Sequence, residues 1–154
     1  MADLIVAAVQ MDAQVGMVET NLGRATELVE QAAGQGAKLV VLPELFSTGY
    51  AYTDRNFDLS EPLSGTTGTW IIETARRLGV HLVGSLPAQV DGKAHIVAML
   101  AAPDGRNWLY RKNHVAMWEN CYFERGSEPL VAETDLGRIG LLICWDQVFA
   151  DLAR

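Results

Sequence analysis

The chain has 154 residues, of which 49% are hydrophobic and only two are cysteines, and its formal net charge is −7. This composition allows one domain whose core needs no disulfide or metal, and the scattered Lys and Arg residues form no basic patch. No apolar run reaches the ~20 residues that cross a bilayer and the N-terminus lacks a basic secretion-signal segment, so we expect a cytoplasmic protein that binds neither nucleic acid nor membrane.

The first part of the chain predicts alternating strands and helices. Residues 4–11 form a mostly apolar run of strand length, which favours a central strand buried on both faces. Residues 21–35 repeat apolar side chains at helical spacing, and two glycines end this helix. A second buried strand at residues 39–43 leads directly to Glu44. Glu44 is therefore expected at the carboxyl end of a strand, where open α/β sheets place their sites.

A long polar loop follows over residues 46–61, and we expect it to border that site. Ser64 is placed to cap a helix over residues 67–78. The next apolar run, at residues 80–87, predicts a third strand. The order up to this point is therefore βαβαβ.

The pattern then changes to hairpins. Asp91-Gly and Asp104-Gly are turn signals, and they delimit two strand-like runs at residues 94–101 and 107–112. These runs predict antiparallel strands, so the sheet as a whole is expected to be mixed. An irregular stretch over residues 113–129 follows.

The last elements are a strand pair and the beginning of a helix. Residues 130–134 and 138–144 are expected to pair about the turn at Leu136-Gly, and a helix is expected to begin at Asp146. The chain stops one or two turns into that helix, so we expect a domain, residues 1–154, that is truncated at its C-terminus.

Cys144 is placed where the last strand meets this helix. Unpaired N–H groups at the positive end of a helix favour a thiolate and hold a developing oxyanion, so this corner is suited to a nucleophile. Glu44 and Lys112 each end a strand-like run as well. We expect these three groups to meet at one rim of the sheet.

Other cysteines and histidines have weaker signals. Cys121 lacks the motif context of Cys144 and is expected to be structural or partly exposed. His114 raises the alternative of a Cys-His dyad, which we disfavour, and His81 and His95 lie within strands and are expected to be packed side chains. The sequence predicts no metal site and no cofactor.

Four motifs in order along the whole chain resemble those of the carbon–nitrogen hydrolase (nitrilase) superfamily. The motifs are Leu42-Pro-Glu-Leu-Phe-Ser-Thr-Gly-Tyr, Tyr110-Arg-Lys-Asn-His, Glu119-Asn-Cys-Tyr-Phe-Glu-Arg-Gly126 and Gly137-Arg-Ile-Gly-Leu-Leu-Ile-Cys-Trp-Asp. Each motif alone is a weak signal, but four in the right order, each at an element boundary, are specific.

The resemblance implies an α/β fold, namely an αββα sandwich with a mixed sheet, of which this chain holds the N-terminal half to two-thirds. It also implies a Glu-Lys-Cys triad. Glu44 is then the general base, Cys144 the nucleophile, and Lys112 with the backbone N–H of Trp145 the group that stabilises the oxyanion. Glu119 is the second glutamate, which orients Lys112 or the substrate.

The implied activity is hydrolysis of an amide or carbamoyl C–N bond in a small aliphatic substrate, through a thioester, with release of ammonia or an amine. We expect a homo-oligomer, and the expected pocket walls are aromatic: Tyr50, Trp118, Tyr122 and Trp145. A true nitrilase is disfavoured, because that branch tends to carry Glu where this chain has Asp146. Two further alternatives are a catalytically incomplete subunit that needs a partner half and a thiol-based redox protein that uses Cys144.

Overall fold

The computed structural model describes residues 3–51 and 53–152. Its elements in chain order are β1 (Val6–Ala8), α1 (Val18–Gly34), β2 (Leu39–Val41), α2 (Arg55–Leu59), β3 (Glu61–Pro62), α3 (Thr66–Leu78), β4 (His81–Val90), β5 (Lys93–Ala101), β6 (Asn107–Arg111), η1 (Met117–Cys121), β7 (Val131–Thr134), β8 (Gly137–Gly140) and η2 (Cys144–Val148), where η denotes a 3-10 helix. No helix in these residues combines the length and the apolar character that crossing a membrane requires.

Among the described residues, six strands form one mixed sheet. Its strand order is β1-β2-β4-β5-β6, and β3 pairs with β4 beside that path. β1, β2 and β4 run parallel, whereas β4, β5 and β6 are joined as antiparallel hairpins. The mixed sheet predicted from the sequence is therefore confirmed. β7 and β8 form a separate antiparallel pair.

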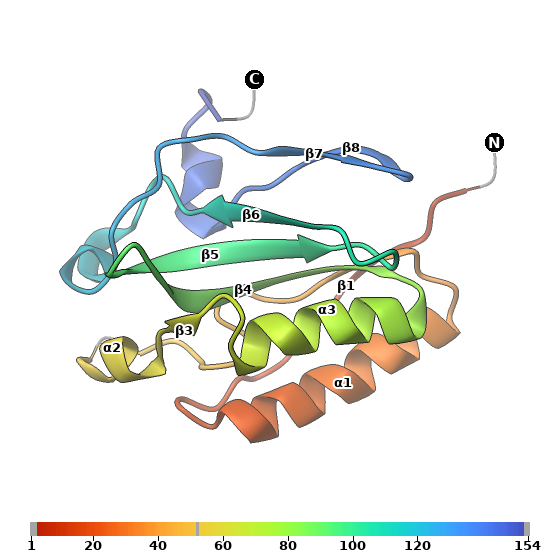
Figure 1. Cartoon of the computed structure of the whole chain (residues 1–154), viewed down its shortest axis with the longest axis horizontal. Coiled ribbons are helices and arrows are strands. Elements are labelled where there is room, and N and C mark those ends of the chain that lie inside the picture. Colours follow the sequence, from red (N-terminus) through yellow and green to blue (C-terminus); the bar gives the residue numbers. More distant parts are fainter. Residues whose placement is uncertain (1–2, 52, 153–154) are drawn as a thin grey trace.

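The sheet is covered differently on its two faces (Figure 1). Helices α1 and α3 pack on one face, where Val29 and Ile71 are fully buried. The β7–β8 hairpin lies over the other face, where Ala132 packs with Ile96 of β5 in a second apolar cluster. The buried charged side chains described below lie on this second side, so the helices serve as the backing layer of the site.

The turn signals of the sequence are confirmed. Asp91 and Gly92 have φ values of 52° and 76°, as a two-residue hairpin turn requires, and they join β4 to β5. Gly79 ends α3 in the left-handed conformation with φ 66°. His81 and His95 are both buried within strands, as expected.

The prediction of a central first strand is wrong. β1 spans only Val6–Ala8 and lies at the edge of the sheet, where it pairs with β2. The side chains of Ile5 and Val6 are 50% and 52% exposed. An apolar run indicates that a segment tends to be buried, but it does not identify the strand that lies beside it.

The expected Ser64 cap is also wrong. Gly65 precedes α3, and it is Glu61 that accepts a hydrogen bond from the backbone N–H of Thr67, at 2.7 Å. Glu61 belongs to β3, which together with α2 gives regular structure to part of the expected loop over residues 46–61. A capping partner six residues away depends on this strand, which the sequence did not indicate.

The corner at Cys144 differs in detail from the prediction. β8 ends at Gly140, so the three residues before Cys144 are not in a strand, and the element that follows is a short 3-10 helix that begins at Cys144 itself. This 3-10 helix ends at Val148, and residues 150–152 form a turn after it. The α-helix expected to begin at Asp146 is therefore not present in residues 146–152.

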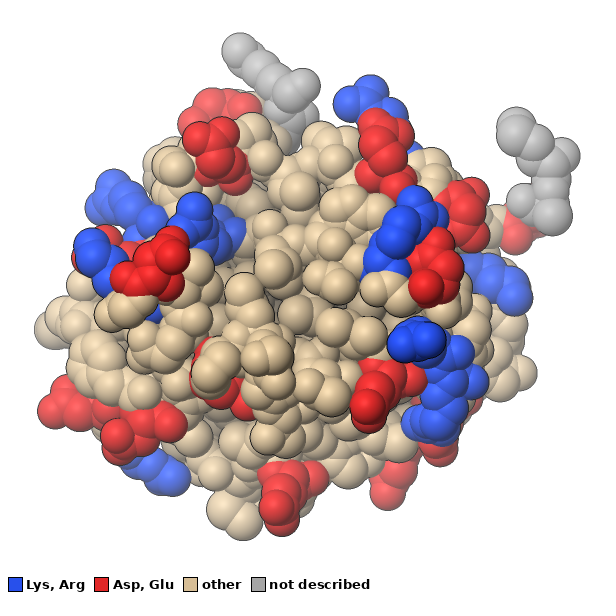
Figure 2. Space-filling model, in the orientation of Figure 1, with Lys and Arg blue, Asp and Glu red and all other residues tan. Residues whose placement is uncertain are grey.

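Charged side chains are mixed on the visible face of the molecule. Figure 2 shows Lys and Arg side chains interspersed with Asp and Glu side chains around the periphery, while the centre of that face is largely uncharged. Positive charge does not gather there in a patch of the kind that binds nucleic acid.

Candidate active site

The structure brings Glu44 and Lys112 together, although 68 residues separate them in the chain. Glu44 lies three residues beyond the end of β2, and Lys112 directly follows β6. The Nζ atom of Lys112 donates a hydrogen bond to Oε1 of Glu44 at 2.7 Å. The sequence-based expectation that these strand ends converge is therefore met in the geometry.

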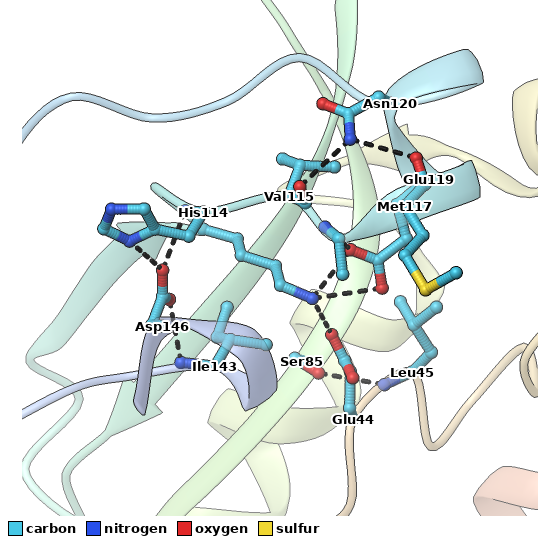
Figure 3. Close-up of polar contacts among 12 residues, drawn as sticks. Glu44, Leu45, Ser85, His114, Val115, Met117, Glu119, Asn120, Ile143 and Asp146 are labelled. Atoms are coloured by element: carbon cyan, nitrogen blue, oxygen red, sulfur yellow. Dashed lines mark hydrogen bonds and ion pairs between the residues drawn. The ribbon is translucent and has the colours of Figure 1, made fainter. Parts of the chain in front are cut away.

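Glu119 is the second partner of the same ammonium group. Its two carboxylate oxygens lie 3.0 and 2.8 Å from Nζ of Lys112, and Figure 3 shows the carboxylates of Glu44 and Glu119 converging. The side chains of Lys112 and Glu119 are 0% and 2% exposed, whereas that of Glu44 is 16% exposed. Glu44 is thus the carboxylate of this cluster that remains open to an entering molecule.

The burial of Glu119 changes its protonation. Burial raises the pKa of its carboxyl to about 7, the negative charge of Glu44 acts in the same direction, and a hydrogen bond from the backbone N–H of Ala116 opposes them. The raised pKa brings the titration of Glu119 towards neutral pH, while both of its oxygens stay within hydrogen-bond distance of Nζ of Lys112.

Cys144 lies next to Glu44, but its thiol is not activated in the way that the sequence suggested. Desolvation by partial burial raises the pKa of the Cys144 thiol, and the charge of Glu44 and a hydrogen bond to it raise the pKa further, while Lys112 opposes them. Burial and Glu44 thus favour the neutral thiol, in the direction opposite to the thiolate that the sequence predicted. The thiol is suited to lose its proton to Glu44 during attack.

Three residues around the site have a strained backbone. Leu45, Met117 and Cys144 have φ values of 51°, 38° and 47°, in a region that residues other than glycine rarely adopt. Such conformations cost about 1–3 kcal/mol each and persist where the surroundings hold them. The hydroxyl of Ser85, for example, accepts a hydrogen bond from the backbone N–H of Leu45 at 2.9 Å. Ser85 lies inside an apolar strand, so no sequence signal identified it.

A cavity of about 180 Å³ contains both Glu44 and Cys144. Its other lining residues, mostly small and apolar, are Val41, Leu42, Val83, Gly84, Ser85, Ala98, Leu142 and Ile143. The cavity is therefore suited to a small molecule beside the thiol.

The four expected aromatic walls do not line this cavity. Tyr50, Trp118 and Trp145 are 37%, 63% and 41% exposed. Tyr122 lines a separate cavity of about 480 Å³ together with Phe57, whose ring meets that of Tyr122 edge to face at 5.9 Å between centroids. Substrate contact by these four residues therefore stays a prediction.

The remaining cysteine and histidine have other surroundings. Cys121 is exposed and lines the larger cavity with Tyr122. Nδ1 of His114 lies 3.1 Å from the carboxylate of Asp146. This contact favours a structural role for His114 over a dyad with Cys144. Within the described residues, no group of three or more His, Cys, Asp or Glu side chains is arranged to hold a metal ion.

Known proteins match nearly all of this chain. The family model for carbon-nitrogen hydrolases matches residues 5–154. The chain is 36% identical to a nitrilase from Pyrococcus abyssi, over 97% of this chain and 58% of that protein. It is 37% identical to omega-amidase NIT2 from Danio rerio, over 87% of this chain and 52% of that protein. The chain thus spans slightly more than half the length of these relatives.

A solved structure extends the likeness to the fold. XC1258 from Xanthomonas campestris, a CN-hydrolase superfamily protein with an arsenic adduct in its active site, superposes with a TM-score of 0.91 at 31% identity. The match covers 100% of this chain and 58% of that one. The mixed α/β fold described above is therefore that of a known group of enzymes.

Proposed function

Because the chain belongs to the carbon–nitrogen hydrolase family, we propose that it hydrolyses a non-peptide C–N bond of a small amide or carbamoyl substrate through a thioester on Cys144. The observation that carries this proposal is the ammonium of Lys112, held 2.7 Å from Glu44, beside a cavity that Glu44 shares with Cys144. A base, a nucleophile and a fixed positive charge then act on one carbonyl group.

The first half of the reaction forms the thioester. Glu44 takes the proton of the Cys144 thiol while the sulfur attacks the carbonyl carbon, and the C–O π electrons move to the oxygen. The Lys112 ammonium and the backbone N–H of Trp145 stabilise this oxyanion. When the intermediate collapses, the C–N bond breaks and the leaving nitrogen takes the proton from Glu44. The raised pKa of Cys144 fits this order, because the proton leaves as the C–S bond forms.

The second half consumes one water molecule. Glu44 takes a proton from the water as its oxygen attacks the thioester carbon, the same donors stabilise the second oxyanion, and the C–S bond then breaks. The sulfur recovers its proton from Glu44, so the products are a carboxylic or carbamic acid and ammonia or an amine. Glu119 orients the Lys112 ammonium through both steps.

We propose a short aliphatic amide as the substrate class, and the name omega-amidase of one relative supports an amide. The 180 Å³ cavity supports a small group next to the reacting carbon. A nitrile, suggested by the nitrilase relative, is the second candidate. Tyr50, Trp118, Tyr122 and Trp145 are proposed to contact the distal part of the substrate. A homo-oligomer and a cytoplasmic location remain predictions.

An ammonia-release screen tests the proposal. The chain is incubated with short amides, carbamoylamines and nitriles, in parallel with the Cys144→Ala and Cys121→Ala variants. Release from amides that is lost in Cys144→Ala and kept in Cys121→Ala is the expected result. Ammonia release from nitriles alone would favour the nitrile as the substrate over the amide. Equal ammonia release by all three proteins would show that Cys144 takes no part in the reaction.

A further inference from the structure

Asp146, two residues after Cys144, is a buried carboxylate that the proposed chemistry does not use. It is 0% exposed. Its Oδ1 accepts a hydrogen bond from the backbone N–H of His114 at 2.8 Å and lies 3.1 Å from the Nδ1 of that residue. Its Oδ2 accepts hydrogen bonds from the Tyr110 hydroxyl at 2.8 Å and from the backbone N–H of Ile143 at 3.0 Å. Figure 3 shows Asp146 between His114 and Ile143.

These donors come from the two segments that carry the reacting groups. Tyr110 and His114 lie two residues before and two residues after Lys112, and Ile143 directly precedes Cys144. A single carboxylate therefore ties the segment that holds the ammonium to the turn that holds the thiol.

A second contact holds the far end of that turn. The ring of His114 stacks on Phe149 with 3.8 Å between centroids and 8° between planes. Phe149 follows η2, and its backbone N–H donates to the carbonyl of Asp146 at 3.1 Å. The left-handed backbone at Cys144 thus lies between two anchored ends, as a strained conformation requires.

The structure assigns Asp146 as a positioning residue, which holds the turn of Cys144 in register with Lys112 and Glu44. The charges that act most strongly on the thiol are those of Glu44, Lys112 and Glu119. The hydrogen bonds of Asp146 reach the residues on either side of the site, so we expect it to act on Cys144 through geometry. This role rests on the proposed function only in treating Cys144 as the nucleophile.

The test measures the coupling between Glu44 and the thiol. Iodoacetamide alkylation of Cys144 is followed by mass spectrometry across pH, with Cys121 in the same sample as the internal reference. Glu44→Gln removes a negative charge beside the thiol, so it is expected to lower the pH midpoint of alkylation by about one unit. In the Asp146→Asn background the turn relaxes away from Glu44, and the same Glu44→Gln shift is expected to fall to less than about half of that size.

The controls separate positioning from a loss of folding. Asp151→Asn removes an exposed carboxylate five residues further along and is expected to leave the Glu44→Gln shift at full size. A folded Asp146→Asn protein that also keeps the full shift would overturn the assignment. If Asp146→Asn does not fold, Tyr110→Phe, which removes one of the donors, decides in its place: a smaller shift supports the role and an unchanged shift overturns it. Alkylation needs no substrate, so a failure of amide turnover does not affect this result.

Discussion

Two five-residue 3-10 helices, η1 and η2, flank the ammonium of Lys112, and their backbones have similar conformations. They are called the two turns below. η1 reads Met-Trp-Glu-Asn-Cys and η2 reads Cys-Trp-Asp-Gln-Val. Each follows an extended residue and opens on a residue with positive φ, which is 38° at Met117 and 47° at Cys144. The third residue of each is acidic and fully or almost fully buried. The sequence similarity of the two turns is therefore matched by their conformations.

The acidic side chains make the same local contact but different distant ones. Glu119 accepts a hydrogen bond from the backbone N–H of Ala116 at 2.8 Å, and Asp146 accepts one from the backbone N–H of Ile143 at 3.0 Å. In each case the donor is the residue that directly precedes the turn. The longer side chain of Glu119 also reaches Lys112, whereas Asp146 bonds to neutral donors or to a histidine. One turn thus presents a carboxylate to the ammonium, and the other presents a thiol beside it.

The first residues of the turns provide the largest expected contrast. Cys144→Ala removes the proposed nucleophile and is expected to lower kcat/KM for an amide by at least about 10⁴-fold. Met117→Ala changes the equivalent position in η1, whose side chain is 77% exposed, and is expected to leave activity within a few-fold of wild type. Steady-state ammonia release measures both. Comparable losses in the two variants would mean that the turns do not differ in function as proposed.

The acidic residue of η1 predicts a pH dependence of stability. Folding raises the pKa of Glu119 from 4.5 to about 7, so the folded protein binds this proton more tightly than the unfolded chain does. The resulting stabilisation is present below pH 4.5 and is lost as the pH rises through 7, and it amounts to about 3 kcal/mol.

Glu119→Gln keeps a neutral side chain at every pH and removes this dependence. The free energy of unfolding of wild type, measured by urea titration, is therefore expected to fall relative to that of Glu119→Gln between pH 4.5 and pH 7. Parallel curves for the two proteins would contradict the raised pKa.

The tryptophans at the second positions of the turns provide a smaller contrast. Trp145 adjoins Cys144, the proposed nucleophile, and is 41% exposed, whereas Trp118 is 63% exposed. Loss of an aromatic contact with substrate is expected to raise KM about tenfold in Trp145→Ala, with a smaller rise in Trp118→Ala and little change in kcat for either. Steady-state kinetics on the best amide substrate measure both values. Wild-type KM values in both variants would remove these indoles from the substrate site.

The fourth positions are expected to show the smallest effects. Asn120 donates from Nδ2 to the carbonyls of Val115 and Met117 at 3.1 and 3.0 Å, so Asn120→Ala is expected to cost about 1 kcal/mol of unfolding free energy. Gln147 is exposed, and Gln147→Ala is expected to change the unfolding free energy by less than about 0.5 kcal/mol. Urea unfolding at one pH compares them, and a reversed order would contradict the role of Asn120 in holding η1.

Sequence patterns were sufficient to predict which charged side chains of the site lie just beyond the ends of strands. Glu44 and Lys112 each follow a strand of the same sheet, and the hairpin turns at Asp91 and near Gly105 fix how those strands return. Because these signals are local, they predicted that the two side chains meet. The meeting of Glu44 and Lys112 could therefore be predicted from the sequence, whereas Glu119 was identified through the resemblance of its motif.

Features that depend on distant neighbours were not predicted. The edge position of β1 depends on which strand lies beside it, and the cap of α3 comes from Glu61 in a strand of two residues. The pKa of Cys144 rises because burial and Glu44 outweigh Lys112, and a motif does not encode that balance. Likewise, the acidic residue of the Cys-Trp-Asp motif was read as a family signature, while its contacts with Tyr110 and His114 appear only in the folded chain.

The formation of a thioester on Cys144 is tested most directly by rapid quenching of the protein with an amide substrate, followed by peptide mass spectrometry. The expected result is a mass increase equal to the acyl group on the peptide that contains Cys144, present in Cys121→Ala and absent from Cys144→Ala. An acyl group on the Cys121 peptide, or continued ammonia release by Cys144→Ala, would contradict the proposed nucleophile.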